Sequence, residues 1–160
     1  TIWLKRKSIW NIVIGGLAGS FATLAGSAAV NPIIAPEAII LSVILFLWTP
    51  PHFWSLAMAI GDDYEKAGIP MLPNTLSNSL TTYIILFHTI ILVFVTALLM
   101  IYSSSLFYIF AIFIGGGYFI WTSTLLAIRK TRSAAMNNFF GSFVQLGLLL
   151  ILIIVDGIII

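Results

Sequence analysis

Residues 37–66 read EAIILSVILFLWTPPHFWSLAMAIGDDYEK, and this stretch decides the fold class. Between Glu37 and Asp62 there are 24 residues without a charged side chain. A bilayer's hydrocarbon core is about 30 Å thick, and a helix that rises about 1.5 Å per residue crosses it with about 20 apolar residues. The stretch is therefore predicted to be a transmembrane helix that ends in a charged cluster at the membrane surface.

Three more charge-free windows flank this helix: residues 8–36, 67–128 and 133–155. The second is 62 residues long and must hold two crossings. Its break is predicted at residues 102–105, because short hydroxyl side chains favour turns. The sequence thus predicts an all-α, polytopic transmembrane helix bundle within a single membrane domain, residues 1–160. Its five helices are expected at about 11–30, 37–60, 79–101, 105–128 and 137–158.

Composition supports a membrane protein and excludes several other classes. Hydrophobic residues make up 61% of the chain and charged residues only 8%, with a mean hydropathy of +1.14. Soluble domains carry about 25% charged residues. The lack of cysteine excludes disulfides, thiolate metal sites and a cysteine nucleophile. Seven basic residues are too few for a groove that follows nucleic acid, so no nucleic-acid partner is expected.

The basic residues lie at residues 5–7, at Lys66 and at residues 129–132. All three places fall on one side of a five-crossing chain, and basic loops favour the cytoplasmic or matrix side of a membrane. The opposite side carries only Glu37 and Asp156. Both are interpreted as structural, and Asp156 is expected to reach water.

The charged cluster at 62–66 has two interpretations. It can be a set of surface charges, with Asp62 and Lys66 paired one helical turn apart. Alternatively, Asp62 and Asp63 can bind a hard cation such as Mg²⁺, which in turn holds an anionic diphosphate.

A polar stripe leads from this cluster into the membrane. It consists of Trp48, His52, Ser55 and Ala59, spaced 4, 3 and 4 residues apart, and continues to the aspartates. The spacing predicts one helical face that points into the bundle, since lipid does not favour polar groups. Pro50 and Pro51 are expected to kink the helix and shape a cavity. His52 is either a packing residue or part of that cavity.

Other unusual residues of the predicted spans have structural interpretations. His88 is expected to form a hydrogen bond between helices. The glycines at 15, 16, 19 and 115–117 are interpreted as sites of close helix packing.

Residues 46–73, FLWTPPHFWSLAMAIGDDYEKAGIPMLP, resemble the signature stretch of the UbiA-type intramembrane prenyltransferases that act on haem. Residues 4–20, LKRKSIWNIVIGGLAGS, resemble the segment before that signature. From Tyr83 onward the similarity is mostly hydrophobic pattern. The resemblance implies a nine-helix bundle with two aspartate-rich motifs, of which this chain matches the last five helices and the second motif. The chain is therefore expected to be the C-terminal part of a longer protein.

The resemblance also implies an activity: transfer of a farnesyl group from farnesyl diphosphate to a vinyl group of haem b, giving haem O for the haem A and terminal-oxidase pathway. It implies Mg²⁺ as a cofactor, haem A synthase as a downstream partner, and a bacterial cell (inner) membrane or the mitochondrial inner membrane as the location.

The resemblance suggests roles for ten residues. The catalytic candidates are Asp62, Asp63, Lys66, His52 and Tyr64. The candidates for contacts with diphosphate, prenyl group or haem are Lys5, Arg6, Asn11, Trp48 and Trp54. The two aspartates would hold the metal and the cations would neutralise diphosphate. The aromatic residues, together with Phe53, would face the allylic cation, and His52 would contact haem or handle a proton.

Three alternatives stay open. The chain can belong to a prenyltransferase for a quinone precursor, since no physical argument names haem as the acceptor. It can be half of a transporter, with His52 and the acidic cluster along a permeation path. It can also be an inert remnant.

Overall fold

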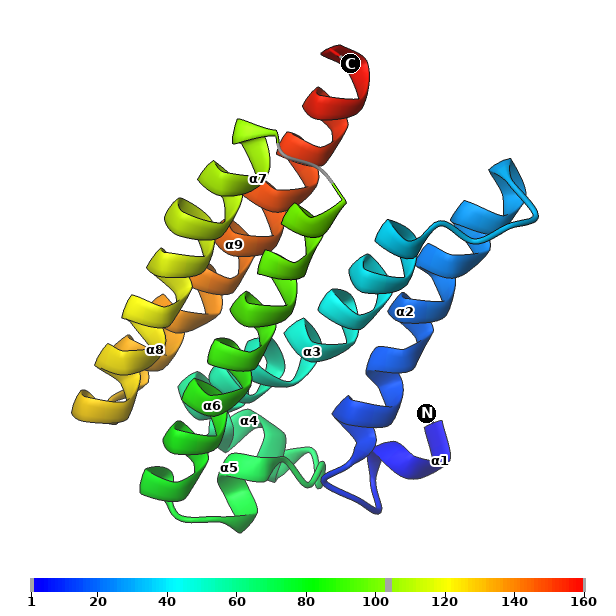
Figure 1. The fold of residues 1–160 in the computed structure, drawn as a ribbon. Coiled ribbons are helices and arrows are strands. Elements are labelled where there is room, and N and C mark those ends of the chain that lie inside the picture. The colour runs from blue at the N-terminus through cyan, green and yellow to red at the C-terminus, as the bar shows by residue number, and fades with distance from the viewer. Residues whose placement is uncertain (1, 103–104, 160) are drawn as a thin grey trace.

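The computed structural model describes residues 2–102 and 105–159. Five long helices make up most of this part of the chain (Figure 1). All five are long and apolar enough to cross a membrane, which confirms the predicted all-α fold. They are α2 (Asn11–Val30), α3 (Pro36–Ala59), α6 (Asn78–Ala97) with a 3₁₀ extension (Leu98–Ile101), a composite of α7 (Leu106–Phe110), a π-helical turn (Ala111–Gly116) and α8 (Gly117–Arg129), and α9 (Arg132–Ile159).

Several boundaries differ from the predicted ones. Helix α9 begins at Arg132 rather than near residue 137, because Lys130 adopts a left-handed conformation (φ 54°) and reverses the chain within two residues. Helix α3 ends at Ala59, and the non-helical Ile60 separates it from α4 (Gly61–Lys66). The predicted helical face therefore does not continue to the aspartates. Of the predicted break at 102–105, Ser103 and Ser104 lie outside the described residues.

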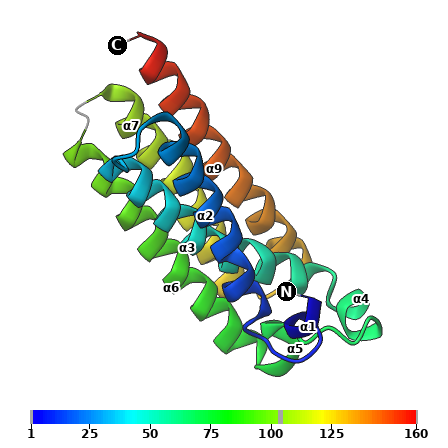
Figure 2. The same cartoon turned by 90° about the vertical axis from the view of Figure 1, so that its right-hand side faces the viewer.

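Helix α3 lies at the centre of the bundle. It packs against α2 on one side and against α6 and α9 on the other, and α8 completes the group with α6 and α9 (Figures 1 and 2). Two buried apolar clusters, both with a residue of α3, hold these helices together. One contains Ile44, Leu92, Leu99, Ala111, Phe119 and Leu149, and the other contains Trp54, Leu72, Ile85, Leu126, Ala134 and Ala135.

Small and polar residues allow the helices to approach closely. A Cβ added at Gly116 would lie 2.9 Å from Val93, so this position needs a glycine. The predicted close packing is confirmed at Gly115 and Gly116, but not at Gly117, where a Cβ would meet nothing within 4 Å. The Asn138 carboxamide oxygen accepts hydrogen bonds from Thr122 and Ser123 of α8, each at 2.8 Å. Its amide nitrogen donates to Ser55 of α3 at 2.8 Å. This buried network joins three helices through groups that lipid could not satisfy.

The short helices α1 (Ile2–Lys5), α4 and α5 (Leu72–Thr75) gather at one end of the bundle, together with the turn between α8 and α9 (Figures 1 and 2). All seven basic residues lie within these segments or directly beside them, and we call this end the basic end.

Asp156 lies far from the basic end, and the prediction that it reaches water is wrong. It is 7% exposed and does not reach water, because α9 continues past it and packs against α7.

Candidate functional site

An apolar cavity of about 480 Å³ lies between α2 and α3. Its volume falls within the range of about 300–1,000 Å³ that is typical of ligand pockets. Glycines at 15, 16 and 19 provide part of its wall on α2. An ideal Cβ at Gly16 would lie 3.1 Å from Thr49, which confirms the close packing expected there, whereas one at Gly19 would meet nothing within 4 Å. The cavity brings together five residues singled out in the sequence: Lys5, Asn11, Trp48, Phe53 and Tyr64.

A larger, polar cavity of about 730 Å³ lies beside the first, at the basic end. Ile69 lines both cavities, so they share a wall in the segment between α4 and α5. Four cations and two carboxylates contribute to the lining of the polar cavity: Arg6, Lys7, Lys130, Arg132, Asp62 and Glu65. The pair of cavities offers an apolar compartment next to a charged one, which suits an amphiphilic ligand with an anionic head.

Asp62 pairs with Arg132 rather than with Lys66. The Nη2 of Arg132 lies 2.7 Å from each Asp62 carboxylate oxygen. The hydrogen bond and the charge of Arg132 lower the pKa of Asp62, with a smaller contribution from Lys66. Because the two side chains are 66% and 59% exposed, the pair is screened by water and stabilises the fold little. It nevertheless connects α4 to the start of α9 across the polar cavity.

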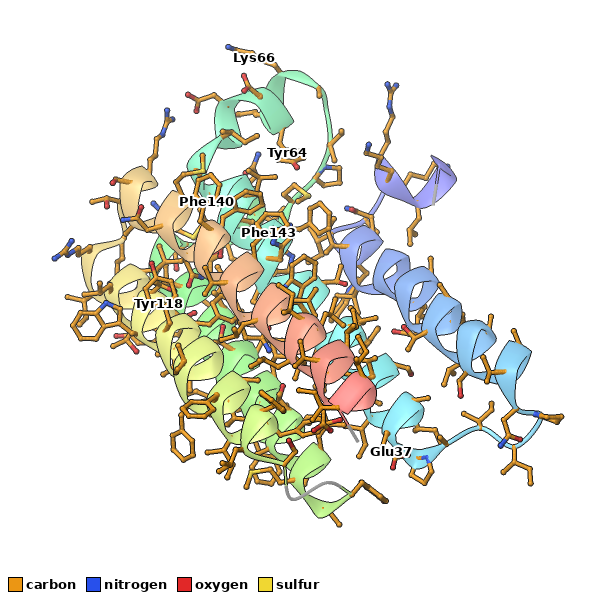
Figure 3. All side chains as sticks on the ribbon, turned by 90° about the horizontal axis from the view of Figure 1, so that it is seen from above. Glu37, Tyr64, Lys66, Tyr118, Phe140 and Phe143 are labelled. Atoms are coloured by element: carbon orange, nitrogen blue, oxygen red, sulfur yellow. The ribbon has the colours of Figure 1, made fainter. Side chains whose placement is uncertain are left out.

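The other residues of α4 point in different directions. Tyr64 lies on the side of α4 that faces the bundle, whereas Lys66 projects away from it (Figure 3). Burial raises the pKa of Tyr64, so its phenol stays protonated at neutral pH and can donate a hydrogen bond into the apolar cavity. Asp63 and Lys66 are exposed and line neither cavity.

The carboxylates of the described residues do not form a complete metal site. No group of three His, Asp or Glu side chains that could hold a metal ion occurs among them. Asp62 is also occupied by Arg132 on both oxygens. Since Mg²⁺ needs nearly octahedral oxygen coordination, the donor set of this chain does not fit the ion by itself.

Asn11 connects the N-terminal segment to the shared wall. Its amide nitrogen donates to the backbone carbonyls of Ser8 at 2.7 Å and of Pro70 at 3.0 Å. Both amide hydrogens are thus used, and only the carboxamide oxygen of this buried residue is left for a ligand. The position of residues 68–71 therefore depends on Asn11.

The two tryptophans of the signature stretch lie on different faces of α3 and contact different neighbours. Trp48 stacks on His52 at a ring-centroid distance of 4.0 Å and lines the apolar cavity. His52 is buried and lines neither cavity. Trp54 is buried against His88 of α6, at 5.3 Å, and is also outside both cavities. His88 donates to the carbonyl of Ile84 in its own helix, and the expected hydrogen bond to another helix is not found among residues 2–102 and 105–159.

Three residues near the site were not identified from the sequence: Arg132, Asn138 and Ser142. Arg132 was interpreted only as a charge that orients the chain. Asn138 and Ser142 lie four residues apart on α9 and bind Ser55 and His52 of α3. Polar residues four positions apart in an apolar span would have predicted that this face of α9 points into the bundle.

The sequence of the chain matches known proteins over nearly its whole length. A sequence model of the UbiA prenyltransferase family matches residues 1–144. Two proteins of Paramagnetospirillum magneticum, named protoheme IX farnesyltransferase 2 and 1, are 53% and 42% identical over 98% of this chain. The alignments cover 54% and 56% of those proteins. A protoheme IX farnesyltransferase of Trichormus variabilis is 42% identical, again over 98% of this chain and 50% of the relative. No solved structure matches the chain.

Five apolar spans, with an apolar and a polar cavity side by side at one end, are the structure of an integral membrane protein. The chain belongs to the UbiA prenyltransferase family. It spans about half the length of the curated relatives that it matches.

Proposed function

We propose that this chain supplies part of the site at which a farnesyl group is transferred from farnesyl diphosphate to a vinyl group of haem b, giving haem O. The observation that carries the proposal is the apolar cavity beside the polar one, with a cationic lining at the membrane surface. The names of the relatives support the acceptor and the prenyl donor.

Each compartment would hold one part of the donor. The farnesyl chain would lie against Trp48 and Phe53 in the apolar cavity, and the diphosphate would lie among the cations of the polar cavity. In the reaction the bond between farnesyl C1 and the diphosphate oxygen breaks, and its electron pair leaves with diphosphate. The vinyl π electrons then form the new carbon–carbon bond. The oxygen of a water molecule adds to the carbocation left on the acceptor and loses a proton to the solvent, giving a hydroxyl group. Arg6 and Arg132 would stabilise the leaving group, and the aromatic faces would stabilise the allylic cation.

We propose Mg²⁺ only as an ion whose ligands come partly from this chain and partly from outside its sequence. Asp62 and Asp63 would supply some of its ligands after Arg132 releases Asp62, and further ligands would come from outside this sequence. No step above depends on the ion.

The basic end is proposed to face the cytoplasm or the mitochondrial matrix, since loops rich in lysine and arginine stay on that side. The membrane would be a bacterial inner membrane or the mitochondrial inner membrane, and haem A synthase would use the product.

Binding of the donor tests the role of the cavities. Gly19→Leu places a large side chain in the apolar cavity, where an added Cβ meets no neighbour. Gly26→Leu is the matched control, because Gly26 lies on the same helix, is equally open and does not line the cavity. We expect Gly19→Leu to weaken the affinity of the chain in nanodiscs for a fluorescent farnesyl diphosphate analogue several-fold, and Gly26→Leu to leave it unchanged. Equal affinities of both variants and the wild type would contradict the proposed cavity.

Transfer itself is tested by extracting haem from membranes that contain the chain together with the remaining half of a full-length relative. Haem O is the expected product, and Asp62→Asn should abolish it without loss of the protein from the membrane. A quinone precursor offered in place of haem b distinguishes the other acceptor.

A further inference from the structure

Ser142 of α9 holds two neighbouring aromatic residues of α3. The indole Nε1 of Trp48 donates to the backbone carbonyl of Ser142 at 2.9 Å. The Nδ1 of His52 lies 2.7 Å from the Ser142 hydroxyl. One residue therefore forms two separate bonds, one through its backbone and one through its side chain.

The hydroxyl of Ser142 determines which nitrogen of His52 carries the proton. It donates its single hydrogen to the carbonyl of Phe139 at 2.6 Å. It can therefore only accept from His52, so Nδ1 is the protonated nitrogen and Nε2 carries a lone pair. No described residue forms a hydrogen bond with Nε2.

Aromatic packing fixes the plane of this imidazole. Trp48 stacks nearly parallel on it, with 20° between the rings. Phe139 lies 4.5 Å away at 31°, and Phe143 and Phe53 approach nearly perpendicular at 4.7 and 5.0 Å. His52 is only 5% exposed. A ring so enclosed is well placed to support a neighbour and poorly placed to contact a substrate as large as haem.

We propose that Ser142 and His52 act as positioning residues that fix the indole of Trp48 as a wall of the apolar cavity. Trp48 is the member of this trio that lines the cavity, and it is held at its Nε1 by Ser142 and on its face by His52. The ligand beside the indole is a prenyl chain, an assignment that rests on the proposed function. The positioning of Trp48 does not depend on that assignment.

The arrangement is tested first by NMR, without any ligand. The chain has two histidines, so His88→Gln leaves the imidazole ¹⁵N signals of His52 alone. We expect the Nδ1–H tautomer in this background. Ser142→Ala should change both the His52 signals and the indole N–H signal of Trp48, although the backbone carbonyl that Trp48 binds is still present. Ser142→Thr retains a hydroxyl and should restore both. An Nε2–H tautomer, or unchanged signals in Ser142→Ala, would overturn the proposal.

A second experiment measures the effect on the cavity. A diazirine analogue of farnesyl diphosphate is photo-crosslinked to the chain in nanodiscs, and the modified residues are mapped by mass spectrometry. Ser142→Ala should lower the crosslinked fraction at Trp48 several-fold, because small displacements of a positioned group have large effects. Thr96→Val, which also removes one buried hydroxyl, is the control and should not.

The outcomes separate this proposal from the proposed function. If the wild type does not crosslink at all, the prenyl site fails, and the NMR signals of His52 and Trp48 still decide the positioning. If the crosslink at Trp48 is the same in Ser142→Ala, the positioning role fails. A haem absorption spectrum that changes in His52→Asn but not in Ser142→Ala would assign His52 to haem contact instead, and would also overturn the proposal.

Discussion

Asn11 holds two carbonyl groups that have no other side-chain partner, and its removal should weaken the basic end. In Asn11→Ala the carbonyl of Pro70 loses this bond, whereas the carbonyl of Ser8 keeps the backbone N–H of residue 11. A typical intramolecular hydrogen bond contributes about 0.5–1.5 kcal/mol, so thermal unfolding in detergent should begin at a lower temperature. Proteolysis within residues 68–71 should become faster.

The control for this variant is Asn31→Ala. Asn31 is exposed at the other end of α2, where its side chain accepts from the backbone of Ile33. It should change the unfolding temperature less. An equal loss in both variants would show that Asn11 has no special role.

The pair of Asp62 and Arg132 gives a prediction about acidity. The pKa of Asp62 is lowered in the folded chain, so the contribution of the pair to stability is present above the unfolded pKa of aspartate, about 3.9. It is lost as the pH falls through the lowered folded value. Arg132→Gln should raise the pKa of Asp62 towards its ordinary value, measured by ¹³C NMR of the carboxylate. Lys66→Gln should raise it less, because Lys66 is the smaller cause. The reverse order would mean that Lys66 is the true partner.

Some residues of the candidate site could be predicted from the sequence and others could not. Lys5, Asn11, Trp48 and Tyr64 were singled out and do line one cavity. The role of Arg132 was missed, because spacing along the chain does not say which loops meet sideways at a membrane surface. The same limit applies to Ser142, whose partners are 90 and 94 residues away.

Packing between α8 and α9 depends on a glycine. A Cβ at Gly141 would lie 2.6 Å from the Thr122 hydroxyl, which already binds Asn138. Gly141→Ala should therefore lower the free energy of unfolding by about 1–3 kcal/mol, as overpacking does. Gly147, also on α9, has open space around it, and Gly147→Ala should leave stability unchanged or raise it by up to about 1 kcal/mol. Chemical denaturation in detergent measures both, and equal effects would contradict the close contact.

Helices were predicted better than their connections. Length and apolar character determine a membrane span, and the predicted bounds 11–30 agree with α2. The short helices α1, α4 and α5 were not predicted as separate elements, because the prediction rested on apolar stretches long enough to cross a membrane. The start of α9 was placed too late for the same reason, since Arg132 and Ser133 lie inside that helix.

The orientation of the whole chain is testable because it contains no cysteine. Single cysteines can be introduced by Lys66→Cys at the basic end and by Ile33→Cys in the exposed loop between α2 and α3. If the basic end faces the cytoplasm, a thiol reagent that cannot cross membranes should label Ile33→Cys in intact bacterial spheroplasts. Lys66→Cys should be labelled only after permeabilisation. The opposite pattern would reverse the proposed orientation.

Ile69 lies in the wall shared by the apolar and the polar cavity, and this wall stands in the path of water from one cavity to the other. On one side of this residue lies a compartment of mostly apolar side chains, and on the other lies a charged compartment at the bilayer surface. A reactive carbocation formed on the apolar side would survive only as long as that boundary kept bulk solvent out. Gly68 adopts a left-handed conformation (φ 63°) next to it, so the backbone at the boundary has a geometry that other residues resist. If the proposed transfer takes place here, residues 68–71, which contribute no charge to either compartment, would therefore set the ratio of prenyl transfer to hydrolysis.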